Sequence, residues 1–240
     1  MPIRQLFALM LLLPGLASAN PDAERLQSIR SQAFSVCSNL LVHYNPNQND
    51  SDPRHAEHYR QALHQLQQLV TQEQDPLLIQ AASDMHQRIG ELERQPASNA
   101  QLYPTWINPL LEAQARLDRQ AGKRYAALAP GEPHREALHR LSLDIERLQL
   151  LYQTRTFGSL AVYVLEMDDN TFVQLDQQIL EGFTALEQDW SQQAAELSKL
   201  KRKYDFIRPR LLKHDLGWVP GGAAYYLGQV TDGLAKLSAE

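Results

Sequence analysis

Histidine is the residue type in this sequence with the most chemical potential, because it binds metals and transfers protons near neutral pH. His55 and His58 stand three positions apart at the expected start of a helix, close enough to act as two metal ligands. Glu57 lies between them, but the pattern differs from His-Glu-x-x-His, and the sequence offers no evident third ligand. We therefore expect solvated surface histidines rather than a metal site.

Segment 45–52 is rich in Asn and Asp, which raises the hypothesis of a calcium loop. It lacks the glycine at the sixth position of an EF-hand, and Ala56 stands where the bidentate glutamate belongs. Turn formation and helix capping explain these residues without a metal. Motifs for haem attachment, a serine nucleophile elbow and a phosphate loop are also missing. The sequence predicts no catalytic residue, no metal and no cofactor.

Basic side chains are concentrated in segment 199–213 of an otherwise acidic chain, with aromatic residues between them. Such a surface could bind an acidic partner or an anionic ligand. The alternative is a solvated helix face whose charges pair with acidic neighbours. The candidate partner-binding residues are Lys201, Arg202, Lys203, Arg208, Arg210 and Trp218.

A second candidate site consists of side chains that can form hydrogen bonds but stand at sequence positions where the helical repeat predicts burial. Tyr152, Arg155, Tyr163 and Trp190 could line a small-ligand pocket between helices. Ordinary core packing explains the same periodicity, so this site is the weaker of the two.

The segment 204–212, the turn 218–220 and the segment 225–227 form the most unusual stretch of the sequence. An aromatic-Phe-Ile run, a leucine pair and a Val-Pro turn precede the last helix there. This stretch resembles the end of the helical periplasmic input domains of type IV pilus and nitrate-type chemoreceptors. The N-terminal glutamine-arginine signature of that family has no counterpart here, and the resemblance assigns no ligand residues. It implies a helical, sensor-like module.

The elements that must position these residues are helices. Leu, Ala, Gln, Glu and Arg dominate, and alternating β-branched runs bounded by tight turns are almost absent. Apolar residues recur at three- and four-residue steps, and prolines fall at boundaries. We predict helices over 22–44, from Pro53 through Val70, from Pro76 through Leu92, and over 104–128, 138–165, 172–186, 197–211 and 223–237.

The predicted fold is all-α: an antiparallel helical bundle or array of about seven to eight helices joined by short loops. Residues 20–240 are expected to form a single domain, with a subdivision near 95–101 or 129–133 as the alternative. Segments 34–63 and 157–180 share a weak pattern that two related helix-hairpin units would explain, although any two amphipathic hairpins look alike.

The first residues predict the compartment. Arg4 precedes an apolar run over 6–13, Pro14-Gly15 follows, and Ala17-Ser18-Ala19 fits a signal-peptidase site. We expect residues 1–19 to be a signal peptide cleaved after Ala19, and the product to enter a bacterial periplasm. The apolar run is too short to span a bilayer, so stable membrane insertion is not expected.

The net charge and the cysteine content exclude further classes of function and one kind of covalent bond. Removing residues 1–19 takes away Arg4 and no acid, so the net charge changes from −5 to −6. Such a chain is not suited to binding nucleic acid. Cys37 is the only cysteine, so an intramolecular disulfide is impossible. The leading hypothesis is a soluble, non-catalytic periplasmic module that binds another envelope protein. A small-ligand sensor and a hydrolase with a dispersed Glu/His site are the alternatives.

Overall fold

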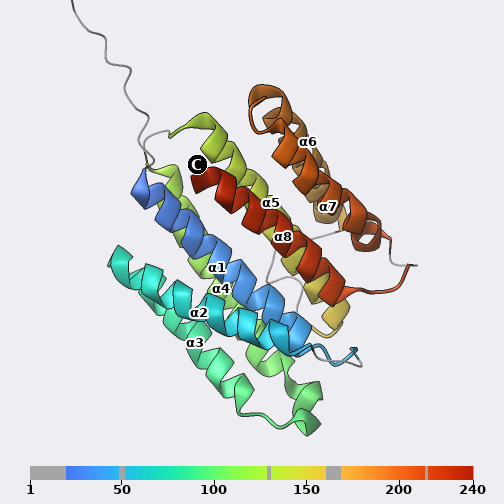
Figure 1. Ribbon diagram of the computed structural model, residues 1–240. Coiled ribbons are helices and arrows are strands. Elements are labelled where there is room, and N and C mark those ends of the chain that lie inside the picture. The colour runs from blue at the N-terminus through green and yellow to red at the C-terminus, as the bar shows by residue number, and fades with distance from the viewer. Residues whose placement is uncertain (1–19, 49–51, 129–130, 161–168, 214–215, 240) are drawn as a thin grey trace, which may run out of the picture.

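The computed structural model describes residues 20–48, 52–128, 131–160, 169–213 and 216–239 (Figure 1). Eight α-helices and one short 3₁₀ helix contain most of these residues, and no strand occurs among them. The all-α prediction is confirmed. The elements are α1 (Pro21–His43), α2 (Pro53–Glu73), α3 (Pro76–Glu93), η1 (Ala97–Leu102), α4 (Pro104–Ala126), α5 (Pro133–Phe157), α6 (Asp169–Asp189), α7 (Ala194–Leu212) and α8 (Pro220–Ala239).

Several helices begin where a polar cap stands directly before a proline. The side chains of Asn20, Asp52 and Asp75 accept hydrogen bonds from backbone N–H groups in the first turns of α1, α2 and α3. Glu132 does the same for α5. Proline at the first helical position has no N–H, and that N–H would lack a partner inside the helix in any case. These pairs set the start of four helices.

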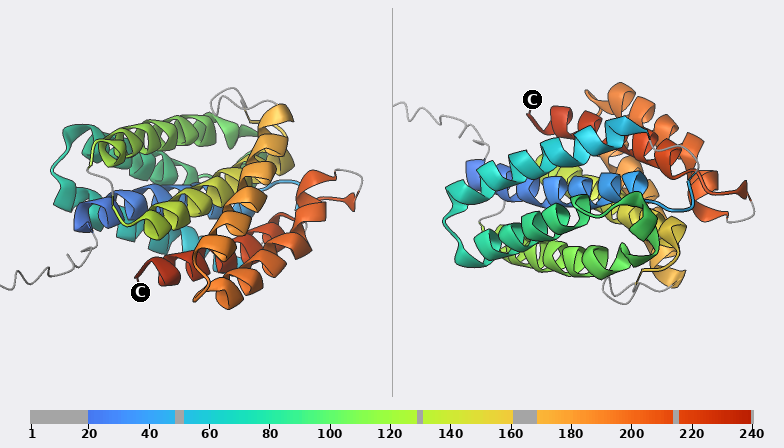
Figure 2. Two further views of the ribbon diagram at one scale, coloured as in Figure 1. Left: turned by 90° about the horizontal axis from the view of Figure 1, so that it is seen from above. Right: turned by 90° about the horizontal axis from the view of Figure 1, so that it is seen from below.

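The helices form two four-helix units that lie against each other (Figures 1 and 2). In the N-terminal unit, α1 packs against α2 and α4, and α3 packs against α2 and α4. In the C-terminal unit, α5 packs against α6 and α8, and α7 packs against α6 and α8. Each unit encloses an apolar core, and α1 joins the units by packing against both α5 and α8.

Helix α5 contributes to both cores because two of its faces are apolar. Leu143, Leu150 and Phe157 pack in the core of the N-terminal unit. Leu141 and Ile145 pack in the core of the C-terminal unit. The boundary between the two cores therefore runs along α5 rather than through a linker.

Cys37 lies in the N-terminal core with no exposed surface. Burial raises the pKa of its thiol above the ordinary value, since the thiolate would lose its hydration. The group therefore behaves as a small apolar side chain. In the described ranges, no helix has the combination of length and apolar character that crossing a bilayer requires.

The fifth helix is shorter than the sequence predicts. The prediction extends it to residue 165, but α5 ends at Phe157, and Gly158 follows with a φ of +82°. A left-handed glycine is a common helix stop. The Asn47 side chain donates hydrogen bonds of 3.1 Å to the carbonyl oxygens of Thr156 and Phe157. Asn47, in the Asn-rich loop after α1, thus caps the end of α5.

Candidate functional site

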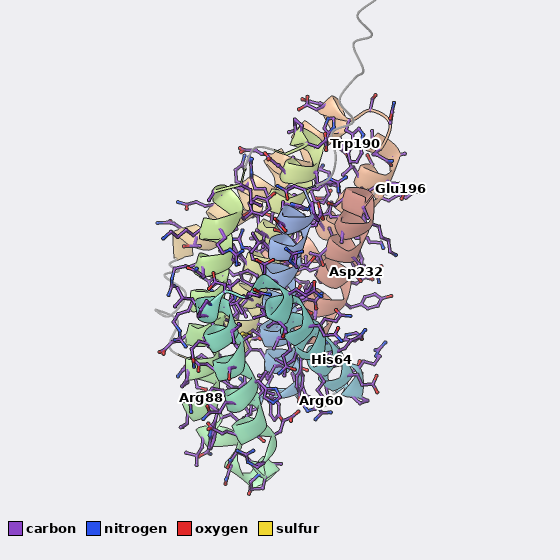
Figure 3. The ribbon with its side chains drawn as sticks, turned by 90° about the vertical axis from the view of Figure 1, so that its left-hand side faces the viewer. Arg60, His64, Arg88, Trp190, Glu196 and Asp232 are labelled. Atoms are coloured by element: carbon purple, nitrogen blue, oxygen red, sulfur yellow. The ribbon has the colours of Figure 1, made fainter. Side chains whose placement is uncertain are left out.

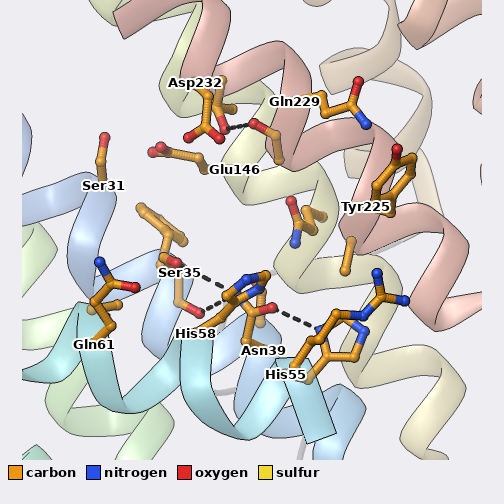
Figure 4. A pocket seen from close by; sticks show the side chains of 18 of the residues that line it. Ser31, Ser35, Asn39, His55, His58, Gln61, Glu146, Tyr225, Gln229 and Asp232 are labelled. Atoms are coloured by element: carbon orange, nitrogen blue, oxygen red, sulfur yellow. Dashed lines mark hydrogen bonds between the residues drawn. The ribbon is translucent and has the colours of Figure 1, made fainter. Parts of the chain in front are cut away.

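A cleft of about 1080 Å³ opens between α1, α2, α5 and α8, where the two units meet. We call it the central cleft. Its floor is buried, whereas its mouth is accessible to solvent. Figure 4 shows side chains from all four helices around it. The polar floor residues are Ser38, Asn39, His55, Ser142, Glu146 and Gln149, and the mouth includes His58, Gln61, Tyr225 and Asp232.

The polar walls of the central cleft come from polar residues at helical spacing. Ser31, Ser35 and Asn39 are four residues apart, so they share one face of α1. Ser142 and Glu146 repeat the same spacing on α5. Because α1 and α5 pack against each other, folding brings these polar faces together at the boundary between the two apolar cores.

His55 lies in the floor of the cleft and is only 7% exposed. Its Nδ1 atom is 2.9 Å from the Asn39 side-chain oxygen, and the Asn39 amide donates to the Ser35 carbonyl at 3.0 Å (Figure 4). An amide oxygen only accepts, so Nδ1 of His55 carries the proton and Nε2 is an acceptor. Burial lowers the pKa of His55, which favours this neutral form.

His58 is exposed at the mouth of the cleft, and its ring meets the ring of His55 edge to face at 6.2 Å between centroids. The prediction of solvated histidines fits His58 but is wrong for His55, because α2 turns His55 toward Asn39 of α1. Within the described part of the chain, no group of three or more metal-ligating side chains occurs.

Glu146 is the most unusual group in the cleft. Only 9% of the residue is exposed, and its Oε1 atom accepts a long hydrogen bond of 3.5 Å from the Ser142 hydroxyl. Among the described residues, Oε2 has no hydrogen-bond partner. Burial raises the pKa of the carboxyl to about 8, with opposing effects from the Ser31 hydroxyl and the Arg30 guanidinium. Glu146 is therefore mainly protonated at neutral pH.

Asp232 occupies the mouth of the same cleft, near the middle of the bundle (Figure 3). Desolvation by the surrounding protein raises the pKa of its carboxyl, although the group still reaches solvent. Lys236 and His58 act in the opposite direction by their charge. Among the described residues, Asp232 forms no ion pair within 4 Å. Besides Asp52, which is paired with Arg54, the cleft thus holds one carboxyl at its floor and one at its mouth.

Several of the predicted partner-binding residues form hydrogen bonds or ion pairs with other residues of the protein itself. Arg208 donates to both carboxylate oxygens of Asp176, at 2.6 and 2.7 Å, and so links α7 to α6. The ammonium group of Lys203 donates to Gln229 of α8 at 2.6 Å. Lys201 lies 3.9 Å from the carboxylate of Asp205 on the same helix. These three cations have protein partners.

The other members of that set lie nearer the surface. Arg202 is exposed on α7. The guanidinium of Arg210 donates to the Leu216 carbonyl and thereby holds the turn before α8. Trp218 is 45% exposed, and its ring packs edge-on against Tyr152 at 5.6 Å between centroids. The set therefore does not form one continuous basic surface.

The predicted ligand-binding residues do not converge on one pocket. Tyr152 has no exposed surface, and its hydroxyl accepts a hydrogen bond from the Val219 backbone. The guanidinium of Arg155 lies 4.4 Å from the centre of the Phe172 ring. Tyr163 lies outside the described residues.

Trp190 is at a distance from the other predicted ligand residues. It stacks on His134, with 5.1 Å between ring centroids, near one end of the bundle (Figure 3). His134 stands in the first turn of α5 and Tyr152 near its last, which are about 27 Å apart at the usual rise per residue. Trp190 and Tyr152 therefore cannot contact one small ligand.

Apart from the two histidines and the segment 45–52, which contributes Gln48 and Asp52, the residues of the cleft were not predicted from the sequence. A signal for them exists in hindsight: polar residues repeat every three or four positions on α1 and α5, between the apolar positions that mark the cores. Such an intervening polar stripe on a helix that packs on several sides indicates a buried polar contact. Which stripe faces which depends on the tertiary arrangement.

The polar groups of the central cleft include the acceptor Nε2 of His55 and the carboxyl of Glu146, and the mouth of the cleft carries the carboxyl of Asp232. Comparison of the chain with family models, with curated proteins and with solved structures finds no match.

Proposed function

We propose that this protein binds a small polar molecule in the central cleft without transforming it. The observation that carries the proposal is the Glu146 carboxyl, which is buried in the cleft floor while its Oε2 atom lacks a partner among the described residues. A buried polar group without a hydrogen bond costs about 1–3 kcal/mol. A ligand that forms a hydrogen bond with this atom would offset that cost.

The shape of the cleft supports the same proposal. A volume of about 1080 Å³ is slightly above the usual range for small-molecule sites, about 300–1,000 Å³, so a small molecule fits with room to spare. Glycines on α8 keep one wall open: a Cβ atom added to Gly228 would meet no heavy atom within 4 Å. The accessible mouth gives a solute a path to the floor.

We also propose that the protein works in a bacterial periplasm. The support is the pattern of residues 1–19, which lie outside the described residues: a basic residue, an apolar run and a small-residue cleavage site. In that compartment the cleft would face the solutes that cross the envelope. The proposed module would then sense or carry such a solute.

Binding of an envelope protein through segment 199–213 is a second proposal with less support. Exposed Phe206, at 66%, and exposed Arg202 favour it. The internal bonds of Arg208 and Lys203 count against it, because a partner would have to replace them.

Hydrolysis by a dispersed Glu/His site has weaker support still. A general base must lie within hydrogen-bonding reach of the group it assists. Among the described residues, neither His55 nor His58 is hydrogen-bonded to Glu146 or to Asp232, and the Nδ1 atom of His55 is bonded to an amide.

The test is ligand binding to the purified chain, with the cleft open and with the cleft filled. Melting temperatures are measured with a panel of amines, amino acids, dicarboxylates and mono- and disaccharides, and positive compounds are confirmed by calorimetry. Gly228→Leu fills the cleft from the α8 wall. Gly90→Leu is the matched control, because this glycine also lies in a helix and its added Cβ would meet only Arg94.

We expect at least one compound to raise the melting temperature of the wild-type chain and of Gly90→Leu, and to lose this effect with Gly228→Leu. If no compound in the panel binds, or if the filled variant binds as well as the wild type, the central cleft is not a ligand site.

A further inference from the structure

We propose that the ligand of the central cleft is an organic cation with an ammonium group, bound between Glu146 at the floor and Asp232 at the mouth. This inference rests on the proposed function and specifies its substrate class. It uses three observations: the charges that line the cleft, the atoms there that lack partners, and the position of the two carboxyls along the path into it.

The charged residues of the cleft lining leave an excess of acid. Arg54 forms an ion pair with Asp52 at 2.6 Å, so these two charges compensate each other at the edge. Among the described residues that line the cleft, no Lys or Arg pairs with Glu146 or Asp232. A cationic ligand would supply a countercharge to Asp232 and to ionised Glu146, whereas an anionic ligand would add a like charge beside Asp232 and oppose the ionisation of Glu146.

The unpartnered atoms of the floor are suited to a donor-rich ligand. Oε2 of Glu146 and the hydroxyl oxygen of Ser38 have no hydrogen-bond partner among the described residues, and Ser38 is 1% exposed. Nε2 of His55 is an acceptor because Nδ1 donates to Asn39. An ammonium group has three N–H donors and no acceptor, which complements acceptor atoms of this kind.

Binding of a cation is coupled to ionisation of Glu146. The charged and titratable groups that influence this carboxyl are Arg30 from α1, Asp118 from α4 and Arg147 from α5. Arg30 is itself bound to Asp118 at 2.6 Å, which limits its effect on Glu146. Below pH 8 an ammonium ligand must displace the proton of Glu146, so its affinity should rise up to tenfold per pH unit and level off above that pH.

The experiment compares isosteric probes that differ in charge. The probes are n-butylammonium, 1,4-diaminobutane, n-butanol and butyrate, titrated by calorimetry into the full chain at pH 6, 7, 8 and 9. Proton release is measured from the heat of binding in two buffers of different ionisation enthalpy. We expect both amines to bind, the alcohol and the carboxylate to bind at least tenfold more weakly, and about one proton to be released below pH 8.

Three variants locate the effect. Glu146→Gln keeps the size of the protonated carboxyl and removes the charge, and Asp232→Asn does the same at the mouth. Asp205→Asn is the control, because Asp205 is an exposed acid on α7 outside the cleft. We expect at least a tenfold loss of amine affinity in each cleft variant, loss of proton release in Glu146→Gln, and wild-type behaviour in Asp205→Asn. If Glu146→Gln fails to fold, Asp232→Asn carries the test.

The outcomes separate this inference from the proposed function. If a neutral or anionic compound binds in the cleft better than the amines, or if the cleft variants bind amines like the wild type, the cation proposal is overturned while the cleft remains a binding site. If no compound binds and filling the cleft changes nothing, both proposals fail.

Discussion

Glu146 is a carboxyl group that folding moves out of water without placing a bonded cation beside it. The basic group with the largest effect on it, the Arg30 guanidinium, is bonded to Asp118 across the interface of α1 and α4. The energetic solution is protonation, because a neutral carboxyl loses less hydration than an ion does. This carboxyl therefore favours the folded protein at low pH, where it is protonated, and both a rise in pH and the binding of a cation must remove its proton.

This residue predicts how stability depends on pH. Burial raises the pKa of its carboxyl from the ordinary value of 4.5 to about 8, so between these pH values the native state holds a proton that the unfolded chain has lost. Its contribution is complete below pH 4.5 and is lost as the pH rises through 8, by up to about 4–5 kcal/mol. Glu146→Gln stays neutral and should remove this loss. Urea unfolding at pH 5, 6.5 and 8 should show near-equal stability at pH 5 and a more stable variant at pH 8.

The matching control is Asp205→Asn, whose pH dependence should run parallel to that of the wild type. Parallel curves for Glu146→Gln as well would mean that the carboxyl is already ionised in the folded protein at neutral pH.

At this scale the sequence reveals residue types but not their surroundings. His55 is visible as a candidate, yet the same letters predict a solvated histidine, because nothing local shows that Asn39 of α1 will face it. Glu146 and Asp232 are ordinary acids in amphipathic helices until α1, α5 and α8 come together. Their altered pKa values arise from burial, which is a property of the tertiary arrangement.

Helix boundaries, in contrast, are largely readable from the sequence. The Asp-Pro pairs at 52–53 and 75–76 act locally, so the starts of α2 and α3 agree with prediction. The end of α5 does not, because the apolar residues after Phe157 look like a continuing helix. The stop depends on Gly158 in a left-handed conformation and on Asn47, which reaches the last carbonyls from a loop more than a hundred residues away.

Close packing of α7 on α8 gives a prediction for two glycines of one helix. A Cβ atom on Gly233 would lie 2.9 Å from Cδ1 and 3.2 Å from Cγ of Leu200, so alanine there must push a buried side chain aside. On Gly228 it would meet nothing within 4 Å. We expect Gly233→Ala to lower the free energy of unfolding by about 1–3 kcal/mol and Gly228→Ala to raise it by up to about 1 kcal/mol. Urea unfolding monitored by circular dichroism measures both.

Because both changes add one methyl group to α8, helix propensity alone would make the two variants equally stabilising. A stabilised Gly233→Ala variant would contradict the tight contact between α7 and α8.

The whole molecule consists of two four-helix units, and α5 of the C-terminal unit contributes apolar residues to both cores. The order of neighbouring helices is the same in both units, which agrees with two related units but does not test the proposed internal repeat. Residues 161–168, which contain much of the second copy of that pattern, lie outside the described residues. The all-α class follows from composition and periodicity, whereas the pairing of the units through polar faces of α1 and α5 follows from packing.

Sharing of α5 predicts that the two units unfold together. Trp106 packs against the N-terminal core, and Trp190 packs against the C-terminal core. Trp106→Phe leaves reporters only in the second unit, and the double variant Trp190→Phe/Trp218→Phe leaves one only in the first. In each variant, the fluorescence and circular dichroism transitions in urea should coincide. A fluorescence transition that ends before the dichroism changes would show that one unit unfolds alone.

The rate at which Cys37 reacts with a thiol reagent should report how often the N-terminal core opens. A soluble thiol reagent finds no accessible sulfur in the native chain, and the buried thiol resists conversion to the reactive thiolate. The rate of covalent labelling therefore depends on how often α1 separates from its neighbours. The Cys37 sulfur thus gives a measure of the opening of this part of the fold without an introduced probe.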